Sequence, residues 1–232
     1  MNEQWISVKS SDGFAIDVFV VRPEVPAKAA VVVGMEIFGV NSHIQEVCKR
    51  LAGEGYVAIA PQLFDRIQKN VDMGYSADDV VQGKALKQQA EDGLQAVIAS
   101  DIQACIDWAY DHEGVNKVGM MGFCWGGLNT WRAAQHAQSL WAAICYYGGG
   151  MVAENELADK PVAPVLAHFS DNDATTPPDG IATLRERYGE EAVVYEYPAA
   201  HGFNCDQRGA YNQGAAEVAW QRSLAFLRMC LQ

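Results

Sequence analysis

The sequence predicts a single α/β domain over residues 1–232, in which helices cover both faces of a mostly parallel central sheet. Short apolar runs alternate along the chain with segments of helical periodicity, as in consecutive βαβ units. Half of the 232 residues are hydrophobic, so the chain can bury a sizeable core. The charged fraction of 20% is ordinary for a globular protein and argues against extensive disorder.

The first half of the chain opens with an alternating pattern that places apolar side chains on one face of a strand, at Phe14, Ile16, Val18 and Val20. The turn-forming residues 10–13 before this strand predict a hairpin. Continuous apolar runs are typical of strands buried on both faces, and helical spacing of apolar residues indicates an amphipathic helix. These patterns predict strands at 29–33 and 56–60, and helices at 43–55 and 94–110.

The second half repeats the alternation of strands and helices. Strands are predicted at 117–121, 142–146, 164–169 and 192–197, and helices at 128–137 and at the carboxyl end. The last helix has one apolar face, made by Trp220, Leu224, Leu227 and Leu231. Ligands bind beyond the carboxyl ends of the strands in open parallel sheets, so we expect the functional residues there.

Composition excludes several classes of function. The net charge of −12 disfavours binding to nucleic acid or to anionic membranes. The six cysteines are widely spaced without a C-x-x-C pair, so neither a zinc site nor a disulfide framework is expected. No secretory signal and no membrane-spanning apolar run are recognised, so a cytoplasmic protein is expected.

The most informative motif is Gly122-Phe123-Cys124-Trp125-Gly126-Gly127, which lies between a predicted strand and a predicted helix. A G-x-C-x-G sequence in this context predicts a nucleophile elbow, the sharp turn of the α/β-hydrolase fold. Such a turn exposes its nucleophile, and the following helix directs its positive N-terminus at the site. Cys124 is therefore the predicted nucleophile, while four other cysteines are expected to be buried small side chains: Cys48, Cys105, Cys145 and Cys230.

The nucleophile elbow predicts an acid and then a histidine further along the chain. Two carboxylates, Asp171 and Asp173, follow the predicted strand 164–169, and Asp173 is favoured because it stands four residues before Pro177. Of the five histidines, His201 alone follows the last predicted strand, so it is the predicted base. The remaining ones are expected at the surface or, for one within a strand, in the core: His43, His112, His136 and His168.

The oxyanion of an acyl-transfer intermediate needs two backbone N–H donors. One is expected from Trp125, directly after the nucleophile, and the second from Ile37, in the turn after the strand 29–33. Glu36 in the same turn has two interpretations. It is either a solvated loop carboxylate or a nearby anion that governs protonation of the Cys124 thiol.

Taken together, these motifs resemble the dienelactone hydrolases, or carboxymethylenebutenolidases, over nearly the whole chain. The resemblance rests on residues 36–39, the elbow around Cys124, residues 171–177 and residues 201–204. It implies Cys124 as nucleophile, His201 as base and Asp173 as orienting acid, with Glu36 contacting the nucleophile. The implied reaction opens the lactone ring of dienelactone to give maleylacetate, without metal or cofactor.

The sequence departs from this family in the groups that would hold a substrate carboxylate. The family uses two arginines; Arg208 matches the second, but no arginine lies between Arg66 and Arg132, where the first is expected. Lys84 and Lys87 fall in that interval and are interpreted as a solvated helix face. The predicted substrate-binding residues are Phe38, Phe123, Phe203, Arg208 and Tyr211.

Two alternatives to lactone opening remain at this point. One is a general carboxylesterase or thioesterase of the same fold, with an apolar acyl pocket that also includes Trp125. The other is a non-hydrolytic protein in which Cys124 is a redox-sensing thiol. In each case a small molecule is the expected partner, and the protein is expected to be a monomer or a weak homo-oligomer.

Overall fold

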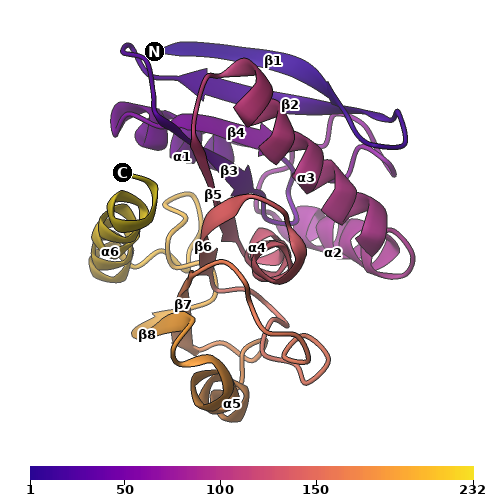
Figure 1. Cartoon of the computed structure of the whole chain (residues 1–232). Helices are drawn as coiled ribbons and strands as arrows, with labels where there is room; N and C mark the ends of the chain where they lie inside the picture. The colour runs from indigo at the N-terminus through magenta and orange to yellow at the C-terminus, as the bar shows by residue number, and fades with distance from the viewer. The chain divides into compact units, whose positions relative to one another are not determined.

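A computed structural model describes residues 1–232, and its secondary structure is drawn in Figure 1. The chain divides into two compact units, Met1–Gly119 and Met120–Gln232, which are described one at a time. Strand β5 (Lys117–Phe123) carries the chain from the first unit into the second. The prediction of one domain over the whole chain stays a prediction.

The first unit contains four strands and three helices before β5: β1 (Asn2–Lys9), β2 (Ala15–Arg22), β3 (Ala29–Gly34), α1 (Ser42–Gly53), β4 (Val57–Pro61), α2 (Ala77–Glu91) and α3 (Gln95–His112). Its strands lie in the order β1-β2-β4-β3, with β3 and β4 parallel and the other two pairs antiparallel. The N–H of Ser10 donates to the carbonyl of Phe14 at 2.8 Å, so the predicted hairpin is confirmed.

Burial follows the sequence pattern in this unit. Every residue of β3 is buried, as its continuous apolar run predicted, and α1 packs against β2, β3 and β4. Helix α3 packs against β1, β3 and β4 (Figure 1). Helix α2 was not predicted, because only Gly83, Leu86 and Ala90 of its 15 residues are buried and its apolar face is weak.

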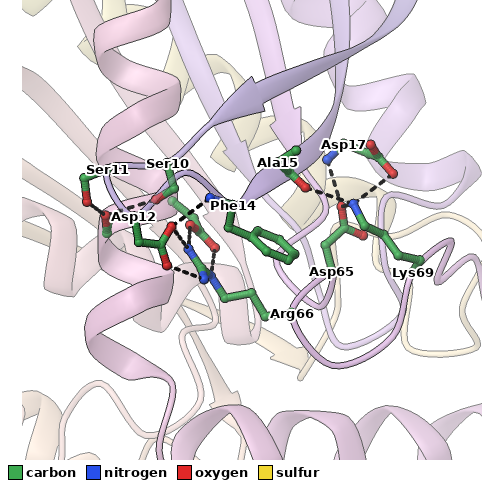
Figure 2. A network of polar contacts seen from close by, with 11 residues as sticks. Ser10, Ser11, Asp12, Phe14, Ala15, Asp17, Asp65, Arg66 and Lys69 are labelled. Atoms are coloured by element: carbon green, nitrogen blue, oxygen red, sulfur yellow. Dashed lines mark hydrogen bonds and ion pairs between the residues drawn. The ribbon is translucent and has the colours of Figure 1, made fainter.

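A network of polar contacts fixes the β1–β2 turn to the rest of the unit (Figure 2). Arg66, from the segment after β4, donates to Asp12 of the turn and to Asp101 of α3, each at 2.7 Å. Its guanidinium also lies 4.4 Å from the centroid of the Phe14 ring. Beside it, Lys69 donates to Asp65 at 2.7 Å. The network therefore joins three segments that are distant in sequence.

The second unit continues with three helices and three strands: α4 (Trp125–His136), β6 (Leu140–Tyr146), β7 (Val165–Asn172), α5 (Pro178–Tyr188), β8 (Ala192–Ala200) and α6 (Gln213–Leu231). Strands β6, β7 and β8 pair in this order and are all parallel, as predicted. Helix α6 packs against all three strands, α4 against β6 and α5 against β8. In Figure 1 α5 lies beside the end of β8.

Several predictions in these units need correction. His43 lies in α1 with only 4% of its surface exposed, so its interpretation as a surface residue is wrong. Cys230 is half-buried rather than buried. Helix α4 begins at Trp125, three residues before the predicted start. Helix α5 was not predicted, although Pro178 in its first turn is a common signal of a helix start. None of the helices combines the length and the apolar composition that crossing a membrane requires.

Candidate active site

Cys124 lies at the sharp turn between β5 and α4. Its backbone has φ 54° and ψ −115°, in the left-handed half of conformational space that residues with a Cβ rarely adopt. The N–H of Cys124 donates to the carbonyl of Tyr146 at 3.0 Å, and its carbonyl accepts from the N–H of Leu128. The turn is therefore fixed on both sides, by the end of β6 and by the first turn of α4.

The glycines of the motif give this turn the room it needs. A Cβ on Gly122 would collide with the carbonyl carbon and oxygen of Gly126 and with the hydroxyl of Thr130. A Cβ on Gly127 would lie 2.8 Å from the carbonyl oxygen of Tyr146. The close packing of α4 on the ends of β5 and β6 thus explains the glycines on either side of the nucleophile position.

Asp173 lies in the turn after β7, where local hydrogen bonds orient its carboxylate. The N–H and the hydroxyl of Thr175 donate to Oδ1 at 2.9 and 2.7 Å. With Oδ1 held in this way, Oδ2 accepts from Nδ1 of His201 at 2.6 Å. The Asp173 side chain is only 1% exposed, which shields this charge-assisted bond from water.

His201 follows β8, and its ring lies between two acidic groups. In addition to its bond with Asp173, it hydrogen-bonds with the side chain of Cys124. The ring of Tyr147 packs edge-on against it, with the centroids 5.2 Å apart. Gly202 beside it has φ +88°, a conformation that suits glycine, so the backbone can turn sharply directly after the histidine.

The electrostatics of the site favour a charged histidine. Burial lowers the pKa of His201, but the negative charge on Cys124 and the hydrogen bonds with Asp173 and Cys124 outweigh it and raise the pKa to about 10. Burial likewise raises the pKa of Asp173, but the bonds from His201 and Thr175 outweigh it and hold this pKa below its usual value. The arrangement therefore stabilises an imidazolium between the Asp173 carboxylate and the side chain of Cys124.

The structure distinguishes the two carboxylates that the sequence left open. Asp171 is exposed near the end of β7, and its Oδ1 accepts from the N–H of Ala199 in β8 at 3.3 Å, so it is a strand residue rather than the expected turn residue. Asp173 is the one in contact with His201. The second unit thus brings together three of the predicted site residues, Cys124, Asp173 and His201.

Other predicted residues lie in the first unit, in the loop after β3. Glu36 is completely buried and accepts a hydrogen bond from the Tyr75 hydroxyl at 3.2 Å, so it is not a solvated loop carboxylate. Phe38 packs against the Tyr75 ring, with the centroids 4.7 Å apart. Helix α2 passes close to Ile37, since a Cβ on Gly83 would collide with the Ile37 carbonyl.

The predicted substrate-binding residues of the second unit differ in their exposure. Phe123 and Phe203 are fully buried and both pack against Tyr146 and Tyr147. Tyr211 is 40% exposed. The guanidinium of Arg208 lies against the backbone of Gly202, where a Cβ would lie 2.7 Å from Cζ. This cationic group is therefore placed directly beside the residue that follows His201.

The sequence reasoning missed two residues in contact with this cluster. Thr175 holds Asp173, and the Asp-x-Thr spacing was a usable signal because Asp side chains commonly accept from the N–H two residues on. The second residue that was missed is Gly149, in the Gly148-Gly149-Gly150 segment after β6. A Cβ on it would lie 3.1 Å from the Thr175 hydroxyl and 3.7 Å from Cε1 of His201. Glycine at this position leaves space beside the imidazole.

Comparison with known proteins agrees with the family resemblance that the sequence motifs indicated. The model of the dienelactone hydrolase family matches residues 16–231. A Synechocystis relative named as a carboxymethylenebutenolidase is 37% identical over 206 residues, covering 83% of this chain and 82% of its own. A Saccharolobus solfataricus relative of the same designation is 31% identical and covers 94% and 95%.

Solved structures extend the similarity to the fold. A Klebsiella pneumoniae structure described as a dienelactone hydrolase is 31% identical, with a TM-score of 0.82 over 98% of both chains. A dienelactone hydrolase-like phosphotriesterase from metagenomic libraries has a TM-score of 0.83 at 20% identity and covers both chains completely, which is likeness of fold alone. The α/β-hydrolase fold is thus confirmed, and the chain is a carboxylic ester hydrolase that belongs to the dienelactone hydrolase family.

Proposed function

We propose that this hydrolase opens a small lactone or ester, of the dienelactone type, by acyl transfer through Cys124, His201 and Asp173. The observation that carries the proposal is the position of the His201 ring, bonded to Asp173 at 2.6 Å and to the Cys124 side chain on its other side. A nucleophile, a base and a group that orients the base are thereby in contact, as acyl transfer requires.

The first step forms a thiol ester. The Cys124 thiolate attacks the carbonyl carbon, and the tetrahedral intermediate then collapses with cleavage of the carbon–oxygen bond to the leaving group. The His201 imidazolium gives its proton to the departing oxygen, while Asp173 keeps the ring in orientation. Because the histidine has a pKa of about 10, it is protonated at neutral pH and can serve as this acid.

The second step returns the enzyme to its starting state. Neutral His201 removes a proton from water, the resulting hydroxide attacks the thiol ester, and the carbon–sulfur bond breaks. Cys124 leaves as a thiolate beside the re-formed imidazolium, and the acid product departs. Because thiolate leaves more readily than an unactivated alkoxide, activated esters and enol lactones are the favoured substrates.

We assign the oxyanion to the N–H groups of Trp125 and Ile37. Trp125 is the first residue of α4, where backbone N–H groups have no acceptor within the helix. In this proposal Glu36, the buried carboxylate of the loop after β3, acts on the protonation of Cys124. Loss of one oxyanion donor typically costs ~2.7–4 kcal/mol of transition-state stabilisation. Displacement of either N–H group should therefore lower kcat measurably.

The substrate class follows from the family and from Arg208. The names of the relatives designate carboxymethylenebutenolidases, whose substrate carries a carboxylate. Arg208 lies against Gly202 and supplies a fixed cation next to His201. Replacement Arg208→Ala is expected to raise KM for dienelactone about tenfold or more and to leave a neutral aryl ester unaffected. Equal effects on both substrates would favour a general esterase.

The mechanism is tested by comparing wild type with Cys124→Ala, His201→Ala and Asp173→Asn on dienelactone and on p-nitrophenyl acetate. We expect turnover to fall by roughly 10³-fold or more in the first two variants. The Asp173→Asn loss should be smaller, about 10²-fold, because a thiolate needs less help from the base than the alkoxide of a Ser-His-Asp triad. Cys230→Ala, at a half-buried cysteine of α6, is the matched control and should retain full activity.

A rapid burst of nitrophenol equal to the enzyme concentration is expected before the steady state, since acylation precedes slower hydrolysis of the thiol ester. Mass spectrometry of the quenched enzyme should place the acetyl group on Cys124. Turnover that survives in Cys124→Ala would refute covalent catalysis by this thiol. Alkylation of Cys124 without turnover of any ester would instead favour the redox-sensing alternative.

A further inference from the structure

A buried chain of hydrogen bonds lies behind the proposed active site, between the sheet of the second unit and α6. It joins the side chains of Tyr146, His168, Tyr197, Arg222 and Ser223. The Ser223 hydroxyl is its centre, because it lies 2.7 Å from the Tyr146 hydroxyl and 3.0 Å from Nε2 of His168. Ser223 and His168 are both completely inaccessible to water.

One assignment of the protons satisfies every partner in this chain. In it, Ser223 donates its only proton to the carbonyl of Ala219 at 2.9 Å and accepts from both of its other neighbours. Tyr146 and His168 are then the donors in those two bonds. The burial of His168 and the charge of Arg222 lower its pKa to about 3, so the ring is neutral, and in this assignment its proton is on Nε2.

The other end of the chain is consistent with this assignment. Because Nδ1 of neutral His168 has no proton, it accepts from the Tyr197 hydroxyl at 2.8 Å. Tyr197 in turn accepts from Nη1 of Arg222 at 3.1 Å. The Arg222 guanidinium stacks on Tyr195, with Cζ 3.8 Å from the ring centroid. Donors and acceptors thus match along the whole chain, with one orientation of each proton.

Two contacts connect this chain to the proposed catalytic residues. The carbonyl of Tyr146 accepts from the N–H of Cys124 at 3.0 Å, so the position of Tyr146 determines the position of the Cys124 backbone in the turn. The next residue, Tyr147, has φ 37° and donates its N–H to the carbonyl of His168 at 2.7 Å. Its ring packs against His201. The end of β6 therefore touches both the nucleophile and the base.

We infer that Ser223 is a positioning residue for the proposed reaction: its hydroxyl fixes Tyr146 and His168 to α6, and through them it sets the relative placement of Cys124 and His201. The inference rests on the proposed function, since it concerns the geometry of the same thiol–imidazole pair. Serine suits the position because one small hydroxyl accepts two hydrogen bonds and donates a third. Alanine would leave two buried donors without an acceptor, whereas threonine keeps the hydroxyl.

The test compares Ser223→Ala with Ser223→Thr and with Leu227→Ala, which truncates a buried side chain one turn further along α6. All variants are assayed at least 10 °C below their melting temperatures. We expect Ser223→Ala to lower kcat at least tenfold with KM within twofold, and to slow alkylation of Cys124 by iodoacetamide at pH 7 by a similar factor. Ser223→Thr should return both rates to within threefold of wild type.

Leu227→Ala separates positioning from stability, because it should lower the melting temperature while kcat and the alkylation rate stay within twofold of wild type. Equal rates in Ser223→Ala and Leu227→Ala, or no recovery in Ser223→Thr, would overturn the inference. Alkylation reports on the thiol–imidazole pair even if no ester is turned over. Failure of the proposed function, seen as absent hydrolysis in wild type, is thus distinguishable from failure of the positioning role.

Discussion

At the scale of single residues, the proposed chemistry depends on a backbone conformation that works against stability. Cys124 has φ 54° and ψ −115°, and a side chain in such a region typically costs about 1–3 kcal/mol. The structure tolerates this cost because the Tyr146 carbonyl, the glycine motif and α4 hold the turn from several directions. The strain exposes the sulfur of Cys124 at the start of a helix, next to His201.

This strain predicts that Cys124→Gly is more stable than Cys124→Ala, although both abolish turnover. Glycine adopts φ > 0 without a Cβ clash, so strain relief should exceed its entropy cost and leave a net gain of about 1 kcal/mol. The alanine variant keeps the clash and removes the thiol, which makes it the matched control. Urea denaturation of both proteins measures the difference. Equal midpoints would show that the elbow is not strained.

The charged state of His201 makes a second prediction at this scale. With its pKa at about 10, the imidazolium lies beside Cys124 throughout the neutral range and stabilises the thiolate there. We expect the rate of alkylation by iodoacetamide to fall less than about tenfold between pH 9 and pH 6. In His201→Ala it should fall roughly 200-fold, as for a free thiol of pKa ~8.5. Identical pH profiles in the two proteins would contradict the ion pair.

At the scale of elements, the Arg66 network predicts which ionic contacts matter for stability. The Asp101 side chain is 2% exposed and that of Arg66 is 11% exposed, whereas that of Asp12 is 48% exposed. Asp101→Asn removes the buried charge that Arg66 contacts while Asp12 still compensates the guanidinium, so it should cost about 1.5–3 kcal/mol, the range for hydrogen bonds to charged groups. Asp12→Asn removes the exposed partner of the same arginine and should hardly change the urea midpoint. Similar losses in both variants would indicate that burial does not determine the strength of these contacts.

The elements also show how much of the fold can be predicted from the sequence alone. The strands and the elbow were predictable because apolar runs and the glycine motif are local signals. Helix α2 was missed because it is exposed almost all round, although its Ser76–Asp79 capping box marked its start. The contacts of Ser223 with Tyr146 and His168 carry no local signal, since they join residues 77 and 55 positions apart. Such contacts arise only from packing of α6 on the sheet.

At the scale of the whole molecule, the buried His168 and the half-buried His201 give the stability of the protein opposite pH dependences. His168 has a folded-state pKa of about 3, below the unfolded value of 6.5, so its contribution is complete above pH 6.5 and is lost as the pH falls. His201 has a folded-state pKa of about 10, so its contribution is complete below pH 6.5 and is lost as the pH rises towards 10. The lowered pKa of Asp173 adds to the loss in acid. His168 and Asp173 therefore make stability rise with pH up to about 6.5.

The range above pH 6.5 provides the sharpest test. Burial raises the pKa of the thiols of Cys48, Cys105 and Cys145, so these groups reduce stability only above their unfolded pKa of ~8.5. Because the Cys124 thiol can exchange a proton with the same imidazole, the contribution of His201 is measured in Cys124→Ala, where the bond to Asp173 remains. Urea denaturation of this variant should show stability falling between pH 6.5 and 8.5, by up to about 1.4 kcal/mol per pH unit, and a flat profile in Cys124→Ala/His201→Ala. A slope that persists in the double variant would mean that another group loses its proton, and that the imidazolium beside Asp173 does not contribute to folding.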